Sequence, residues 1–390
     1  MRTNKICAVL GNIQRYNALL PLTNERPLAT LPFACKYRLI DFPLSSIVNA
    51  NINTVYMIFN EGETQSVFDH IGGGKEWNLD GVHNRFFIHL YQDFLKLKAH
   101  NQSYYRPLID YLEKSKSEYT VYMSSKMICN IDLRAVLKIH QQQNNEMTVV
   151  YKKVESEKIC QTDAVLSLTD NGQITEVRPY MEHLQTSEQE NLCMDIYIVQ
   201  TDWLIRELKE GQQEGTPADI QDFLRKKIHT VKSSTYEHTG YLSNIFDINS
   251  YYNASLDMLN QQKFSSLLYS NQKIYTKLKN EVPTYYSESS EVNNSQFATG
   301  CIIEGKVEGS SISRGTVIDK GTEIIESIIM PSAKICAGAR VQNAILDKEV
   351  VVDPGVQIIG TRENPVVIEK YQHVTNDILA NGVAVGDIER

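Results

Sequence analysis

Residues able to bind an anionic ligand stand at the ends of two expected β-strands. Gly11 and Arg15 follow an apolar run at 6–10, and Lys126 follows another at 120–123. Glycine lets a backbone approach a ligand closely, and a lysine ammonium or arginine guanidinium pairs with phosphate oxygens. Open α/β sheets bind ligands beyond the carboxyl ends of their strands. The loops at these two strand ends are therefore candidates for a pocket that takes a small anionic ligand, and ordinary solvated charges are the alternative.

The elements that must position these residues are short β-rich runs alternating with amphipathic helical stretches. This alternation over residues 1–250 predicts an open, mostly parallel α/β sheet domain. Strands are expected at 6–10, 54–59, 120–123, 147–151 and 195–199, and helices at 44–49, 132–142, 201–210 and 220–227. Residues 251–296 are expected to form a helix, from the pattern at 250–268, and a linker, from the polar, proline-containing stretch 282–296.

From Ile312 onward, aliphatic residues recur every six positions in three runs. The runs are Ile312, Ile318 and Ile324; Ile329, Ile335 and Val341; and Leu346, Val352 and Ile358. A period of six fits neither a helix nor a strand, but hexapeptide repeats build a left-handed parallel β-helix with aliphatic residues pointing to its axis. Glycine follows three residues after several of these, where the chain turns a corner: Gly315, Gly321, Gly338 and Gly355. We expect the repeats at about 297–367, in a C-terminal domain 297–390 that ends in a tail.

Composition limits the classes of function. The chain has 390 residues, 42% of them hydrophobic, a formal charge of -8 and a pI of about 5.7. An acidic chain argues against a broad nucleic-acid interface, which needs clustered Lys and Arg. Seven cysteines without C-x-x-C spacing suggest neither disulfides nor a zinc site, and no stretch approaches a membrane span. We therefore expect a cytoplasmic protein without nucleic-acid or membrane partners.

Several segments match motifs of one enzyme family. They are Lys36-Tyr-Arg-Leu-Ile-Asp41-Phe-Pro-Leu-Ser45, His70-Ile-Gly-Gly-Gly-Lys75-Glu-Trp77-Asn-Leu-Asp80, Gly240-Tyr241 and Glu326-Ser-Ile-Ile-Met-Pro331. Over nearly the whole chain they resemble ADP-glucose pyrophosphorylase (glucose-1-phosphate adenylyltransferase). The resemblance implies a Rossmann-like, GT-A-like nucleotidyltransferase domain with a mixed sheet at 1–250, followed by the β-helix. It also implies attack of glucose 1-phosphate on the α-phosphorus of ATP, with Mg²⁺ held by carboxylates.

Parts of the machinery that the resemblance implies are missing. The family's glycine-rich loop A-G-G-x-G-x-R-L is reduced to Gly11 with bulky neighbours, which disfavours a triphosphate cradle. Lys126 stands where the family's S-G-D-H carries a metal-binding Asp, and an ammonium cannot coordinate Mg²⁺. Asn249 takes the place of the second metal-binding Asp in D-V-G-T-I-D. Asp247 would share its face if that segment were extended.

Changes also fall in the sugar-phosphate region. Arg178 keeps one positive charge of the family's E-K-P, Asp195 replaces the glycine of S-M-G-I-Y, and Leu28 replaces the basic residue of K-P-A-V-P-F, with Arg26 nearby. Six residues are therefore candidates for a ligand pocket: Gly11, Arg15, Arg26, Lys126, Arg178 and Asp195. No catalytic or metal-binding residue is expected, and Lys126 and Asn249 mark the degenerate positions.

These losses predict little or no activity from this chain alone. The family includes an auxiliary subunit of bacterial glycogen biosynthesis that modulates a catalytic subunit within a heterotetramer. The resemblance therefore implies a non-catalytic or weakly active regulatory subunit that binds no cofactor itself, with Mg in its catalytic partner. It implies a hetero- or homo-oligomer such as a tetramer, and it leaves room for a small phosphorylated effector.

Two other functions remain open. One is an active sugar-phosphate nucleotidyltransferase whose metal site is rebuilt from Asp247 or Asp195. The other is a sensor or assembly protein that binds a sugar phosphate through Arg178 and Lys126.

Overall fold

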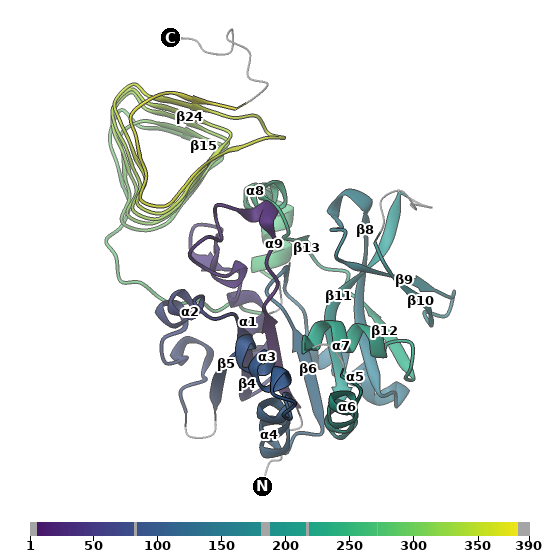
Figure 1. Cartoon of the computed structure of the whole chain (residues 1–390). Helices are drawn as coiled ribbons and strands as arrows, with labels where there is room; N and C mark the ends of the chain where they lie inside the picture. Colours follow the sequence, from purple (N-terminus) through teal and green to yellow (C-terminus); the bar gives the residue numbers. More distant parts are fainter. Residues whose placement is uncertain (1–5, 82–83, 181–187, 216–217, 271, 381–390) are drawn as a thin grey trace.

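The computed structural model describes residues 6–81, 84–180, 188–215, 218–270 and 272–380. Within these residues an α/β domain lies below a triangular coil, and helices α8 and α9 lie between the two (Figure 1). No helix in this part of the chain is long and apolar enough to span a bilayer.

The α/β domain is built on one mixed sheet. Its main path runs β10-β9-β11-β6-β1-β4-β5, and β8 joins β11 to β12. The strands are β1 Ile6–Asn12, β4 Thr54–Phe59, β5 Arg85–Leu90, β6 Tyr119–Met123, β8 Met147–Glu155, β9 Ala164–Leu168, β10 Ile174–Pro179, β11 Gln189–Gln200 and β12 Ser233–Glu237. β1 pairs in parallel with β4 and β6, whereas β11 runs antiparallel to β6, β8 and β9. The predicted strands are present, and the sheet is mixed because β11 reverses direction.

Helices cover both faces of this sheet. They are α1 Asp41–Asn49, α2 Thr64–Ile71, α3 Tyr91–Ala99, α4 Arg106–Ser115, α5 Leu133–Gln143, α6 Thr201–Glu214 and α7 Ile220–Lys227. Alternate residues of β6 enter two separate cores, with Val121 and Met123 in one and Tyr122 in the other. Burial on both faces explains why the central strands are apolar throughout.

Short elements connect the domain's larger parts. The single-turn helices are η1 Asn17–Leu19, η2 Leu28–Thr30, η3 Lys75–Trp77 and η4 Ser156–Lys158. Two small antiparallel sheets pair β2 Pro32–Phe33 with β3 Tyr37–Arg38, and β7 Met127–Cys129 with β13 Leu242–Asn244. The helical pattern expected at 250–268 is two helices, α8 Ile248–Asp257 and α9 Gln261–Leu268. The break falls before Asn260, whose side chain caps α9 by accepting from two backbone amides.

The C-terminal domain is a coil of three parallel sheets (Figure 1). The first contains β14 Tyr285–Tyr286, β17 Ile302–Ile303, β20 Val317–Ile318, β23 Lys334–Ile335, β26 Val351–Val352 and β29 His373–Val374. The second contains β15 Glu291–Asn293, β18 Lys306–Glu308, β21 Glu323–Ile325, β24 Arg340–Gln342, β27 Gln357–Ile359 and β30 Ile378–Leu379. The third contains β16 Gln296–Phe297, β19 Ser311–Ile312, β22 Ile328–Ile329, β25 Ala344–Leu346 and β28 Val366–Ile368.

The six-residue period places one aliphatic residue on each side of each coil. Ile318 pairs with Ile335, and Ile335 with Val352, so that stacked residues lie 17 positions apart. All nine predicted aliphatic residues are fully buried, and the four predicted corner glycines have φ between +66° and +74°. The repeat was thus read correctly from the sequence.

The coil begins and ends beyond the expected bounds. Strands β14 to β16 occupy much of the segment 282–296, which we expected as a linker, and β30 ends at Leu379 instead of 367. The first coil was missed because the side chains of β14 and β15 are exposed, so it shows no buried aliphatic repeat. One coil also carries an extra loop, since Ala344 pairs with Val366, 22 positions away.

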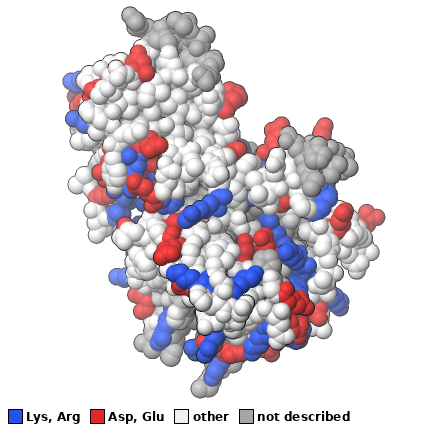
Figure 2. All heavy atoms as spheres, viewed as in Figure 1, with Lys and Arg blue, Asp and Glu red and all other residues white. Residues whose placement is uncertain are grey.

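The two domains share an apolar core. Leu19 and Leu22 from the loop after β1 lie in one cluster with Tyr251 and Tyr252 of α8 and with three β-helix residues: Ile328, Met330 and Ile345. On the face shown in Figure 2, acidic and basic side chains are intermixed over the α/β domain, without an extended basic patch.

Candidate functional site

Gly11 lies near the carboxyl end of β1, beside β6. A Cβ atom at this position would lie 2.0 Å from the hydroxyl oxygen of Tyr122. Tyr122 is buried in the core on this face of the sheet, so it has little room to move. Packing against the neighbouring strand therefore suffices to require glycine here, whether or not a ligand approaches.

Lys126 lies just beyond β6 and is only 4% exposed. Its ammonium donates to Oδ1 of Asp163 and lies 4.9 Å from the centre of the Tyr16 ring. Burial lowers the pKa of Lys126 and the Asp163 carboxylate raises it, and the balance is a raised pKa. The ammonium therefore stays charged, and its counter-charge comes from the protein itself.

Asp163 is 1% exposed, and the second oxygen of its carboxylate also accepts hydrogen bonds. Its Oδ2 accepts from Nδ2 of Asn244 at 2.6 Å and from the backbone amide of Cys160 at 2.9 Å. Asn244 also donates to the carbonyl of Lys158 at 3.0 Å. The end of β13 is thus joined to the same carboxylate as Lys126.

Asp195 forms a second buried cluster on β11. It lies in an irregularity of the β8–β11 pairing and has a φ of +51°, a conformation that favours glycine and that aspartate tolerates. Nε of Arg225 donates to its Oδ1 at 2.7 Å, and Nε2 of Gln221 donates to its Oδ2 at 2.9 Å. The Tyr197 hydroxyl donates to Oδ1 at 2.8 Å.

These contacts keep Asp195 paired. Burial lowers the pKa of the Arg225 guanidinium, but the carboxylate of Asp195 more than offsets this and raises it. A carboxylate in a bidentate pair with a guanidinium has few free lone pairs for a metal ion or a sugar hydroxyl.

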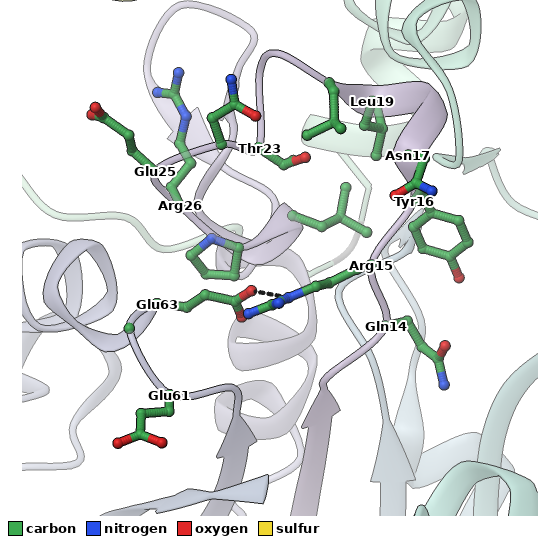
Figure 3. Close-up of a pocket in the computed structure, with 15 residues that line it drawn as sticks. Gln14, Arg15, Tyr16, Asn17, Leu19, Thr23, Glu25, Arg26, Glu61 and Glu63 are labelled. Carbon is green, nitrogen blue, oxygen red and sulfur yellow. Dashed lines mark hydrogen bonds and ion pairs between the residues drawn. The ribbon is translucent and has the colours of Figure 1, made fainter. Parts of the chain in front are cut away.

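The loop at 13–28 covers the space between these clusters. Nε2 of Gln14 donates to Oδ2 of Asp219 at 2.7 Å, and Nε of Arg15 donates to Oε1 of Glu63 at 2.7 Å. In Figure 3, Arg15 extends across a cavity of about 380 Å³ toward Glu63, whereas Gln14 and Tyr16 point to the other side. The side chains that replace a glycine-rich loop therefore bond to the protein.

Little space remains where a ligand would meet these strand ends. The cavity bounded by Gly11, Tyr16, Lys126 and Gln221 has a volume of about 10 Å³. A single water needs roughly 10–15 Å³ by this measure, and pockets for small molecules are about 300–1,000 Å³. A nucleotide cannot enter this small cavity between Gly11 and Lys126 unless the loop at 13–28 moves.

Comparison with known proteins identifies the family. The profile of the nucleotidyl transferase family matches residues 17–261, and that of the GlmU-like C-terminal hexapeptide matches residues 282–378. The glycogen biosynthesis protein GlgD of Bacillus subtilis (strain 168) is 30% identical over 374 residues, which are 95% of this chain and 97% of the relative. The chain belongs to the ADP-glucose pyrophosphorylase family.

Further relatives of this pyrophosphorylase family carry two different names. The glycogen biosynthesis protein GlgD of Geobacillus stearothermophilus is 31% identical, covering 94% of this chain and 96% of the relative. The glucose-1-phosphate adenylyltransferase of Bacillus mycoides (strain KBAB4) is 26% identical, covering 87% of this chain and 91% of the relative.

The side chains at the strand ends do not fit the Mg²⁺ that pyrophosphorylase catalysis implies. Mg²⁺ needs an octahedral set of oxygen ligands that usually includes one or two carboxylates. Here both oxygens of Asp163 accept hydrogen bonds from nitrogen donors, and Lys126 brings a positive charge to the same point. Among the described residues, no group of three His, Cys, Asp or Glu side chains is arranged to hold a metal ion.

Lys126 and Asn249, which stand where the family carries its two metal-binding aspartates, are not brought together in the structure. Asn249 lies in α8, and its amide donates to the carbonyl of Glu363 in the β-helix at 2.7 Å. Asp247 caps α8 by accepting from the backbone amide of Ser250 at 2.7 Å, so the chain is helical from Ile248 and the condition under which Asp247 would share the face of Asn249 is not met. Instead it is Asn244, at the end of β13, that lies beside Asp163 and Lys126.

Two further candidates lie outside the filled pocket. Arg178, on β10, donates to Glu190 of β11 at 3.1 Å. Arg26 is buried at the domain boundary, where it donates to Asp347 of the β-helix and to the carbonyl of Leu22. The structure therefore gives Arg26 a role between the domains.

Sequence reasoning missed most of the partners that fill the pocket. Tyr16, Asp163, Asn244 and the pair Gln221 and Arg225, which both belong to α7, come from four segments that are distant in the sequence. A weak signal was available for Arg225, since Asp195 at a glycine position needs a nearby cation to be buried.

A wider cavity of about 640 Å³ lies between the α/β domain and the first coils of the β-helix. Five basic residues line it: Lys36, Lys273, Lys277, Lys279 and Arg314. Glu281, which pairs with Arg314 at 3.3 Å, is the one acidic residue in its lining. Burial and then the neighbouring cations Arg314 and Lys277 lower the pKa of Lys279, so the charges of this cavity repel one another.

Proposed function

We propose that this chain is a non-catalytic regulatory subunit of glucose-1-phosphate adenylyltransferase, acting on a catalytic partner in glycogen biosynthesis. The observation that carries the proposal is that the chain has the full fold of the family, while the ion pairs Lys126–Asp163 and Arg225–Asp195 occupy the strand ends where a substrate would bind. The names of the GlgD relatives support the link to glycogen biosynthesis. Association with a catalytic partner explains why such a fold would persist without a working pocket.

The test is pyrophosphate release from ATP, glucose 1-phosphate and Mg²⁺. It compares this chain alone, a catalytic subunit alone and the two mixed, with the catalytic subunit at doubled concentration as the control for protein amount. We expect negligible release from this chain alone and a higher rate, or a lower half-saturating substrate concentration, in the mixture. Robust release from this chain alone would overturn the proposal.

The active-enzyme alternative needs Asp195 or Asp247 as a metal ligand. Both carboxylates are already engaged, Asp195 by Arg225 and Asp247 as a helix cap. If the lone chain released pyrophosphate, the double variant Asp195→Asn, Asp247→Asn would decide whether these residues carry the activity. Unchanged activity would exclude them.

A small phosphorylated effector is the ligand that the cationic cavity between the domains would take. Titration calorimetry with a sugar bisphosphate, on the lone chain and without metal, tests this. We expect Lys279→Gln to weaken binding at least tenfold and Lys320→Gln, at an exposed lysine of the β-helix, to leave it unchanged. Equal affinities of the two variants would exclude the cavity.

A further inference from the structure

The Lys126 ammonium joins three segments that are distant in the sequence. It donates to Asp163 in the segment between η4 and β9, and Asp163 in turn accepts from Asn244 at the end of β13. The rings of Tyr16 and Phe246 lie 4.9 and 6.0 Å from the ammonium. A cation near aromatic faces is attracted by their quadrupoles, more strongly where water is excluded.

This arrangement reverses the charges that a metal site requires. A metal-binding pocket offers carboxylates and takes its cation from solution, whereas here the strand end supplies the cation and one carboxylate neutralises it. The ammonium is covalently attached, so it is present at all times and independent of metal concentration. Its contacts are those of a cation that organises surrounding loops.

The loop at 13–28 extends from this cation to the β-helix. At one end Tyr16 lies over Lys126, and at the other Arg26 is paired with Asp347. Between them Leu19 and Leu22 are buried in the core shared with the β-helix. The loop is therefore anchored at both ends by buried cations and, between them, by the buried side chains of Leu19 and Leu22.

We propose that Lys126 is a resident cation that replaces the organising role of a metal ion and holds the loop at 13–28 closed over the pocket without any ligand. The loop thereby couples the pocket to the β-helix through Arg26 and Asp347. Lys126 is a positioning residue here, acting through Tyr16. This role of Lys126 belongs to the isolated chain and does not depend on the regulatory function.

Hydrogen–deuterium exchange on the full chain tests this at two amides. Those of Leu19 and Leu20 donate to the carbonyls of Tyr16 and Asn17 at 3.0 and 3.1 Å, so their protection reports whether the loop is closed. We expect Lys126→Met, which keeps the length but not the charge, to raise their exchange rates at least tenfold. The matched control is Lys153→Met, at an exposed lysine of β8, with rates within twofold of the wild type.

Two further variants keep the test decisive if Lys126→Met fails to fold. Lys126→Arg retains a cation and should keep exchange within about threefold of the wild type. Tyr16→Leu leaves the Asp163 pair intact and should raise exchange at least fivefold. Equal exchange in the wild type and Tyr16→Leu, or in Lys126→Met and its control, would overturn the proposal.

The metal and the coupling are tested separately. Adding 10 mM Mg²⁺ to the wild type should leave both amides unchanged, and protection by Mg²⁺ would show that a metal still organises the loop. Asp347→Asn should raise exchange at Leu19 and Leu20 at least threefold, whereas Asp353→Asn, at a more exposed β-helix aspartate, should not. Equal rates in these two variants would overturn the coupling.

Discussion

In the β-helix one apolar contact recurs every 17 positions, whereas at the strand ends of the α/β domain no contact recurs and buried charges are paired across the chain. Ile318, Ile335 and Val352 are interchangeable in kind. Lys126 and Asp163 are not, because each satisfies the other. Repetition thus makes the β-helix readable from local sequence, and the pocket depends on pairs that local sequence does not connect.

The largest effect should come from placing a charge on the β-helix axis. Val341→Asp puts a carboxylate at a fully buried position with no cation beside it, which should cost about 4 kcal/mol or more. Urea unfolding followed by far-UV circular dichroism measures the loss. Lys334→Asp, at an exposed position of β23, is the control and should change little.

Tryptophan fluorescence sharpens this comparison because Trp77 and Trp203 both lie in the α/β domain. If the β-helix unfolds first in Val341→Asp, circular dichroism will change at lower urea than fluorescence. Coincident transitions at the wild-type midpoint would contradict the assignment of Val341 to the core.

The next effect concerns two ion pairs that join the same loop to the β-helix. Asp347→Ala leaves the Arg26 guanidinium buried and unpaired, which should cost about 3–5 kcal/mol in the free energy of unfolding. Glu25→Gln breaks an exposed pair with Lys370 and should cost about 0–1 kcal/mol. Similar losses in both variants, measured by urea unfolding, would mean that burial does not set the strength of these contacts.

A smaller effect should depend on pH. Burial, and then the neighbouring Asp222, raise the pKa of Asp219 to about 6 from an ordinary value of 3.8. The folded state therefore binds this proton more tightly, so the contribution of Asp219 to stability is greatest below about pH 4 and is lost as the pH rises through 6. The loss is on the order of 1.4 kcal/mol for each pKa unit.

Asp219→Asn should remove this dependence. The wild type should lose stability relative to the variant between pH 4 and 7, as measured by urea unfolding at several pH values. A constant difference across that range would contradict a raised pKa. Arg225, which lowers this pKa, must stay in place in both proteins.

The smallest effect is expected at Gly11. Gly11→Ala forces its Cβ against Tyr122 and should cost about 1–3 kcal/mol through overpacking. Tyr122→Phe removes the nearest oxygen but leaves the ring carbon 2.8 Å away, so the double variant should recover only part of the loss. If the stability that the double variant loses in thermal unfolding equalled the sum of the losses in the two single variants, the contact would be ruled out.

The sequence predicts the repeated contacts of the β-helix better than the paired charges at the strand ends. Strands such as β1 and β4 and helices such as α7 were predicted closely because their apolar periods are local. The first coil was not, because Tyr285 and Tyr286 are exposed and show no buried repeat. Lys126 and Asp195 were singled out from the sequence, yet their partners Asp163 and Arg225 lie 37 and 30 positions away, with no signal for Asp163 and only a weak one for Arg225.

The constant step of the β-helix also fixes where its length can change. Removing or adding 17 residues returns each later side chain to an equivalent side of the triangle, whereas a single-residue deletion within a strand would turn aliphatic residues outward. The extra loop before β28 avoids this problem by leaving the coil at a corner, and Glu363 within it contacts α8. Insertions and deletions among relatives should therefore come as whole coils or as corner loops, and the corner loops are where this domain can acquire new contacts without refolding.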